Sequence, residues 1–134
     1  MRFVLQASAI VVSAGCLFSA AAPARPTALS KPSDVWRLQD SYLRAGKYRQ
    51  LWGLFTPRFH ASCNYSKFLA EAKQQRAETK GLRLVLLSER IVGNRGYLKY
   101  HYLQGSKVVV TIANDLYVRI GGRWLDEVDR VTSC

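Results

Sequence analysis

The chain has 134 residues, of which 20 are Lys or Arg and 9 are Asp or Glu, so its formal net charge is +11. This length allows one domain with a modest hydrophobic core and excludes a multidomain organisation. The charge excess favours anionic surroundings, such as phospholipid headgroups or acidic cell-wall polymers. The basic residues are scattered from Arg25 to Arg130, so a soluble cationic surface without a dedicated partner is an equally good interpretation.

Residues 1–24 have the pattern of a cleaved secretory signal peptide. Arg2 precedes an uncharged, largely apolar segment, and the small residues that follow satisfy the small-x-small rule of a signal peptidase near Ala22 or Ala24. Cleavage removes Arg2 and lowers the net charge from +11 to +10. We therefore expect a secreted or periplasmic, bacterial-type exported protein with no membrane span after cleavage and no nucleic-acid partner.

Two alternatives remain open for this segment. Residues 3–22 are long enough to span a bilayer, and their retention would give a membrane-tethered envelope assembly subunit, although Gln6 and several serines make the span a poor one. Lipidation at Cys16 is the other alternative, but Ser13 stands where bacterial lipoprotein signals usually carry Leu or Val.

The chain after the signal reads as a flexible leader at 25–33, with two prolines and no periodicity, followed by a single domain at 34–134. Apolar residues then recur at spacings of three and four. They predict a first helix that Ser33 or Asp34 caps and that Gly46 ends.

Two further helices are expected before any strand. A short one covers 48–55, and Pro57 prevents its continuation. The next begins near Asn64 or Tyr65 and runs through a polar stretch to a left-handed stop at Gly81.

The period then changes from helical to extended. Apolar or alternating runs at 82–92, 97–103, 108–120 and 123–128, separated by glycine-containing turns, predict four strands, with a bulge at 113–115. Helices followed by a strand meander indicate an α+β fold, in which N-terminal helices pack on a curved antiparallel four-stranded sheet.

Two cysteines, Cys63 and Cys134, remain after cleavage in a chain bound for an oxidising compartment, so we expect them to form a disulfide. A metal site is the alternative. His60 and His101 are the two histidines of the chain, and their spacing with the cysteines matches no paired zinc motif. We expect no metal and no cofactor.

Four segments resemble the nuclear transport factor 2-like superfamily. Residues 42–48 and 51–59 are similar to that family's helix, glycine and short-helix entrance, and 115–120 with 121–124 are similar to its closing hairpin. The resemblance covers nearly all of 34–130. It implies a cone-shaped α+β fold with a cavity between helices and sheet, in a family of isomerases, dehydratases, hydrolases, binding subunits and secreted members of unknown role.

The resemblance implies that an isomerase-like member needs a carboxylate base in the short-helix region and a tyrosine or protonated acid as its partner. Residues 41–70 contain no Asp or Glu, so the expected base is missing. Tyr42, with Asp40 or Asp115, is the remaining catalytic candidate, although Asp40 fits a polar helix face and Asp115 a bulge.

The aromatic residues supply the other candidate site, because they can line a pocket for a small apolar ligand or fill the core. The candidates for such a pocket are Tyr42, Trp52, Phe55, Tyr100, Tyr102 and Trp124. We expect an exported, non-catalytic binding or interaction module whose partner is a small apolar ligand or an anionic envelope component. An isomerase- or dehydratase-like enzyme is the alternative.

Overall fold

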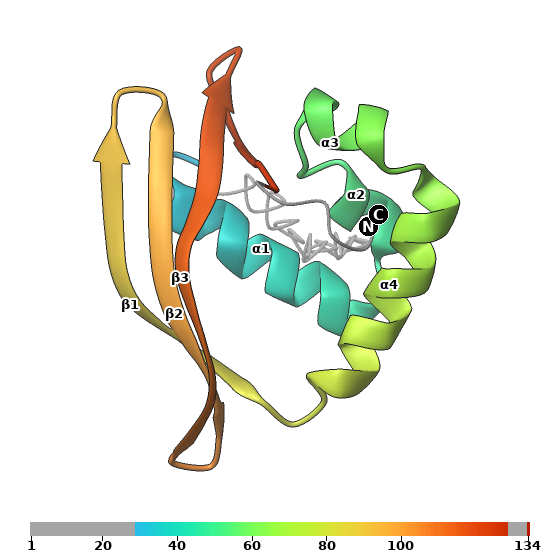
Figure 1. Ribbon diagram of the computed structural model, residues 1–134, viewed down its shortest axis with the longest axis vertical. Helices are drawn as coiled ribbons and strands as arrows, with labels where there is room; N and C mark the ends of the chain where they lie inside the picture. Colours follow the sequence, from blue (N-terminus) through green and yellow to red (C-terminus); the bar gives the residue numbers. More distant parts are fainter. Residues whose placement is uncertain (1–28, 129–133) are drawn as a thin grey trace, which may run out of the picture.

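The computed structural model describes residues 29–128 and Cys134. The expected signal peptide, its cleavage site, Cys16 and residues 25–28 of the leader lie outside these residues. Four helices come first, at α1 Pro32–Ala45, α2 Tyr48–Trp52, α3 Pro57–Ser62 and α4 Tyr65–Glu78. Four strands follow, at β1 Arg83–Val92, β2 Arg95–Gln104, β3 Lys107–Ile120 and β4 Arg123–Asp126 (Figure 1).

The strands form one antiparallel sheet in the order β1-β2-β3-β4. This arrangement confirms the expected α+β class and the four-stranded meander. In Figure 1 the sheet stands on one side, α1 lies next to it, and α4 lies farther away. Within the described part of the chain, no helix has the length and hydrophobicity needed to cross a bilayer.

The start of α1 differs from the sequence-based expectation, because the first helical residue is Pro32 and the N-cap is Lys31. Proline suits this position, where a missing N–H costs no hydrogen bond. Asp34 still serves the helix start, since its Oδ2 accepts hydrogen bonds from the backbone N–H groups of Ser30 and Lys31.

The third helix, α3, was not expected. Pro57 does prevent α2 from continuing, but it also starts α3 as its first residue. Thr56 caps this helix by accepting a 3.2 Å hydrogen bond from the backbone N–H of Phe59.

One hydrophobic cluster joins α1 to the sheet. Val35 on α1 and Tyr117 on β3 are both 0% exposed, and the rings of Trp36 and Tyr100 lie 5.1 Å apart. Trp124 belongs to this cluster, and its Nε1–H donates to the carbonyl of Ser30.

A second cluster joins the end of α1 to α2, α3 and α4. Its buried members are Leu43, Leu51, Phe59, Cys63, Phe68 and Ala72. The expected disulfide is present between Cys63 and Cys134, with a Cα–Cα distance of 4.9 Å. It attaches the C-terminal residue of this chain to the helical layer.

Candidate functional site

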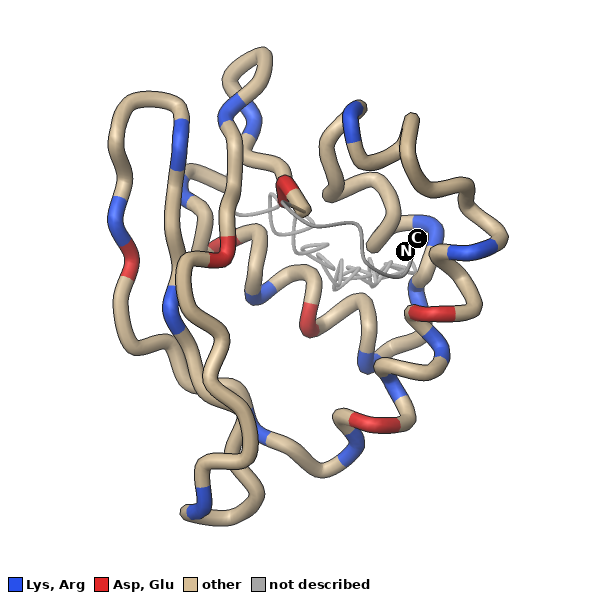
Figure 2. The backbone as a smooth tube through the Cα atoms, in the orientation of Figure 1, with Lys and Arg blue, Asp and Glu red and all other residues tan. Residues whose placement is uncertain are grey.

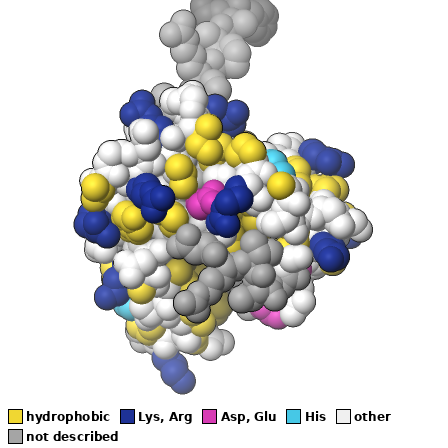
Figure 3. All heavy atoms as spheres, turned by 45° about the horizontal axis from the view of Figure 1, so that its top comes forward, with side chains coloured by type: hydrophobic (Ala, Val, Ile, Leu, Met, Phe, Trp, Pro, Cys, Tyr) yellow, Lys and Arg dark blue, Asp and Glu magenta, His cyan; other side chains and the backbone are white. Residues whose placement is uncertain are grey.

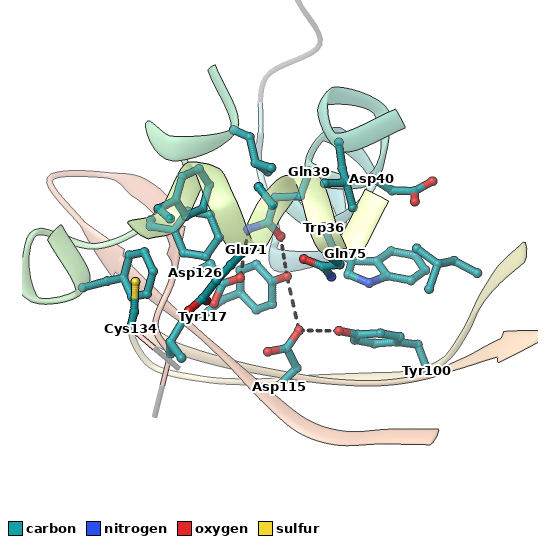
Figure 4. Close-up of a pocket in the computed structure, with 18 of the residues that line it drawn as sticks. Trp36, Gln39, Asp40, Glu71, Gln75, Tyr100, Asp115, Tyr117, Asp126 and Cys134 are labelled. Atoms are coloured by element: carbon teal, nitrogen blue, oxygen red, sulfur yellow. Dashed lines mark hydrogen bonds between the residues drawn. The ribbon is translucent and has the colours of Figure 1, made fainter. Parts of the chain in front are cut away.

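A cavity of about 230 Å³ lies between the helices and the sheet (Figure 4). Every helix and every strand of the fold contributes to its wall. Seven of the lining side chains are aromatic, namely Trp36, Phe55, Phe59, Phe68, Tyr100, Tyr102 and Tyr117. Apolar walls with a few fixed polar groups are characteristic of small-molecule sites.

Five polar side chains of the wall form one hydrogen-bonded chain that runs from the sheet to α1 and back to the sheet. Tyr100 Oη donates to Asp115 Oδ2 over 3.0 Å, and Tyr117 Oη lies 3.4 Å from the same oxygen. Tyr117 Oη also donates to Gln39 Oε1 over 2.7 Å. Gln39 Nε2 then donates to Asp126 Oδ2 over 2.9 Å. We call Tyr100, Asp115, Tyr117, Gln39 and Asp126 the polar relay (Figure 4).

Local backbone features explain how the sheet places this relay. The pairing of β2 with β3 shifts between Ile112 and Asp115, and Asn114 adopts a φ of 56°. This is the expected bulge. A bulge changes the face towards which the following side chain points. It places Asp115 opposite Leu98, on the face that carries the cavity.

Asp126 is held by its backbone as well as by Gln39. Its N–H donates to the carbonyl of Leu54 over 2.8 Å, and its carbonyl accepts from the N–H of Thr56 over 3.0 Å. Asp126 also pairs with Tyr117 across β3 and β4. The loop between α2 and α3 thus fixes the last strand, and with it the end of the polar relay.

Burial alters the proton affinity of the relay. It raises the pKa of Asp126 well above its usual range, and the Asp115 carboxyl raises it further, while the hydrogen bond from Gln39 lowers it. Burial also raises the pKa of Tyr100 and of Tyr117 above the usual tyrosine value. The tyrosines are therefore neutral donors at physiological pH, and the neutral acid is favoured at Asp126.

The cavity differs in charge from the rest of the molecule. Its described wall contains four carboxyl side chains, Asp40, Glu71, Asp115 and Asp126, and no Lys, Arg or His. The exterior is basic, and on the face in Figure 3 the Lys and Arg side chains are dispersed among apolar ones. Asp40 forms an ion pair of 2.8 Å with Arg44.

The structure separates the pocket candidates into two groups. Phe55, Tyr100 and Tyr102 line the cavity, whereas Tyr42, Trp52 and Trp124 are not among its lining residues. Trp52 stacks on His60 with 4.1 Å between ring centroids, and Trp124 packs in the cluster between α1 and the sheet.

The catalytic candidates are separated in the same way. Asp40 and Asp115 line the cavity, whereas Tyr42 packs against both hydrophobic clusters. The tyrosine that contacts Asp115 in this cavity is Tyr100, with Tyr117 on the other side.

Sequence reasoning missed Gln39, Glu71 and Asp126. Two of them had a local signal. Gln39 lies three residues after Trp36 and four before Leu43, within the apolar stripe of α1, and Asp126 lies two residues after the inward-facing Trp124. A polar side chain on a buried face needs a partner, and that requirement could have identified both residues.

Metal chemistry has no ready-made site in residues 29–128, because no group of three or more His, Cys, Asp or Glu side chains there could hold an ion. His60 instead bonds through Nε2 to the Trp52 carbonyl at 2.8 Å, and His101 Nδ1 lies 2.9 Å from Thr111 Oγ1.

The fold and the cavity define a small α+β protein in which helices cover one face of an antiparallel meander. This fold is similar to the solution structure of a SEC-C motif containing protein from Rhodopseudomonas palustris. The TM-score is 0.54 at 13% sequence identity, over 75% of this chain and 77% of that chain. At this identity the likeness shows the fold alone. No protein-family model and no curated protein matches the chain.

Proposed function

We propose that this chain is an exported member of the nuclear transport factor 2-like superfamily that binds a small molecule in the cavity. The order of helices and strands supports the family. The observation that carries the binding function is the polar relay in the wall of a cavity whose other lining residues are mostly apolar. Core filling alone does not require five polar side chains to be linked inside a small domain.

The relay also favours one polarity of ligand. Tyr100 and Tyr117 direct their hydroxyl protons to Asp115 and Gln39, so these donors are used within the chain. The described wall also contains four carboxyl groups and no Lys, Arg or His, although Asp40 is paired with Arg44 and the neutral acid is favoured at Asp126. The ligand that fits is largely apolar and carries a hydrogen-bond donor, which the carboxyl and amide oxygens of the wall can accept.

Native mass spectrometry of the purified protein tests this function. We expect an added mass that is lost in Ala72→Phe, because Ala72 is 3% exposed and lines the cavity. Ala70→Phe is the matched control, since Ala70 is exposed on the same helix. Nile red, an uncharged dye, provides a second probe. Equal dye binding by both variants, with no added mass in the native protein, would contradict the proposal.

An isomerase- or dehydratase-like enzyme is the second candidate, and the contact between Asp115 and Tyr100 favours it. A carboxylate can act as a general base where a neighbouring tyrosine donates to the developing oxyanion. In this candidate Tyr100 takes the role expected of Tyr42, and its hydroxyl proton would turn from Asp115 to the oxyanion when the substrate binds. Deuterium incorporation into the co-purified ligand from D₂O is the test, and Asp115→Asn should abolish incorporation while the ligand remains bound. A pure binding module would show no incorporation in either protein.

Export rests on residues 1–24 and is tested separately. Intact-mass analysis of the protein from the extracellular or periplasmic fraction should show a chain that begins near residue 23 or 25. A retained segment 3–22 would support the membrane-tethered alternative, and a lipid mass on Cys16 would support lipidation.

A further inference from the structure

A second hollow, of about 520 Å³, lies where the C-terminal end of α1 meets the C-terminal half of α4. Eight residues line it, four of them basic and none acidic, and the basic ones are Arg44, Lys73, Arg76 and Lys80. Figure 2 shows blue segments gathered in this region. The hollow shares no lining residue with the cavity described above, and the ion pair between Arg44 and Asp40 joins the two walls.

Arg76 is held in place by the chain. Its Nε–H donates to the carbonyl of Arg44 over 3.1 Å, and its Nη1 lies 3.5 Å from the Tyr48 hydroxyl. The guanidinium also covers Gly46, where an added Cβ would lie 3.1 Å from Nη1. An arginine fixed in this way loses little conformational freedom on binding a ligand with its remaining N–H groups.

Helix capping explains the presence of only some of the basic residues that line the hollow. Basic residues are common at helix C-termini, and Arg44 and Arg76 do donate to backbone carbonyls, at Leu82 and Arg44. Lys73 and Lys80 have no such role, and neither forms an ion pair within residues 29–128. Glu78, the nearby acid on α4, is outside the hollow and accepts from Gln74.

We propose that this hollow binds a multiply charged phosphate group. Arg44 is already paired with Asp40, but Lys73, Arg76 and Lys80 form no ion pair within residues 29–128. These three cations repel one another across the concavity, and an anion of charge near −2 relieves that repulsion. The fixed guanidinium offers directed N–H donors, while the two lysines supply mobile point charges. The phosphate belongs either to a lipid headgroup or to a soluble phosphate compound, and these sources share the chemistry that the hollow recognises.

An NMR titration with inorganic pyrophosphate at constant ionic strength tests the site. We expect saturable shifts of the backbone amides of Arg76, Thr79 and Gly81. The double variant Lys73→Ala/Lys80→Ala should weaken binding by at least about tenfold. Lys67→Ala/Lys107→Ala is the matched control, since it removes two exposed lysines that do not line the hollow and leaves the same net charge.

Shifts that do not saturate, or equal weakening by both double variants, would overturn the proposal, because net charge alone would then explain binding. Sedimentation with vesicles that contain phosphatidic acid, whose phosphomonoester headgroup can carry two negative charges, identifies the source. Loss of sedimentation in the hollow variant alone indicates a lipid headgroup, and pyrophosphate binding without sedimentation indicates a soluble phosphate compound. The proposal is also wrong if both double variants still bind vesicles and pyrophosphate causes no amide shifts.

Discussion

Gln39 on α1 and Asp126 on β4 lie 87 positions apart in the chain and are joined by a hydrogen bond of 2.9 Å. Gln39 also accepts from Tyr117, so this one amide connects the helix to two strands. Gln39→Leu should lower the free energy of unfolding by about 1–3 kcal/mol, because it leaves two buried polar groups short of a partner. Urea denaturation measures the change. Gln50→Leu, on the exposed side of α2, is the control, and an equal loss in both variants would refute the role of the bond.

Asp126 should make stability depend on pH. Burial raises its native pKa, so the folded chain binds this proton more tightly than the unfolded chain does. Its contribution to stability is greatest below the ordinary carboxyl pKa of about 3.9 and is lost as the pH rises through the native pKa.

Asp126→Asn keeps an acceptor for Gln39 but cannot ionise. The unmodified protein loses stability as Asp126 ionises, and the variant does not. The free energy of unfolding of the variant minus that of the unmodified protein should therefore increase from about pH 4 to neutral pH. Denaturation series at several pH values measure this difference, with the exposed carboxylate variant Glu78→Gln as the control for net charge. A difference that stays constant over this range would mean that Asp126 is ionised in the folded chain.

Local signals in the sequence were sufficient for most of the fold. The helices α1 and α4, the four-strand meander and the bulge near Asn114 each follow from periodicity or from turn residues within a few positions. The disulfide was predicted from the cysteine count and the expected oxidising compartment, and it is present. The helix α3 was missed because Pro57 was interpreted only as a stop, although Thr56 before it is a good N-cap.

The candidate site was less accessible to prediction. Asp115 was identified as a bulge residue, and the structure shows that the bulge is what places it opposite Leu98 on the cavity face. Its partners Gln39 and Asp126 come from the first helix and the last strand, and only the assembled fold brings them together. Sequence pattern can show that a buried polar residue needs a partner, but it cannot show which distant residue supplies it.

Gly96 on β2 should not tolerate a side chain. A Cβ added there would lie 2.2 Å from Cγ of Pro32, the rigid ring that starts α1. Gly96→Ala should lower the free energy of unfolding by about 1–3 kcal/mol through overpacking. Gly53→Ala is the matched control, because Gly53 has a helical φ of −66° and its added Cβ meets nothing closer than 3.4 Å. The double variant Gly96→Ala/Pro32→Ala should regain part of the lost free energy of unfolding. If it regains none, close packing of α1 on β2 is not the cause of the loss.

The Cys63–Cys134 disulfide should stabilise both the fold and the cavity. The bond closes a loop of 71 positions, and Cys63 is 1% exposed. In the chain-entropy model such a closure contributes on the order of 4 kcal/mol. Urea denaturation should therefore give Cys134→Ser a free energy of unfolding that is lower by about this amount. A reducing agent should cause the same loss in the unmodified protein and no further loss in the variant.

Because Cys134 also lines the cavity, the same variant should weaken Nile red binding even under conditions where it remains folded. Near-ultraviolet circular dichroism establishes that the fold persists at the dye concentration used. Unchanged dye affinity in the folded variant would mean that the disulfide stabilises the chain without shaping the cavity wall, and a free thiol in the native protein would remove the premise for both effects.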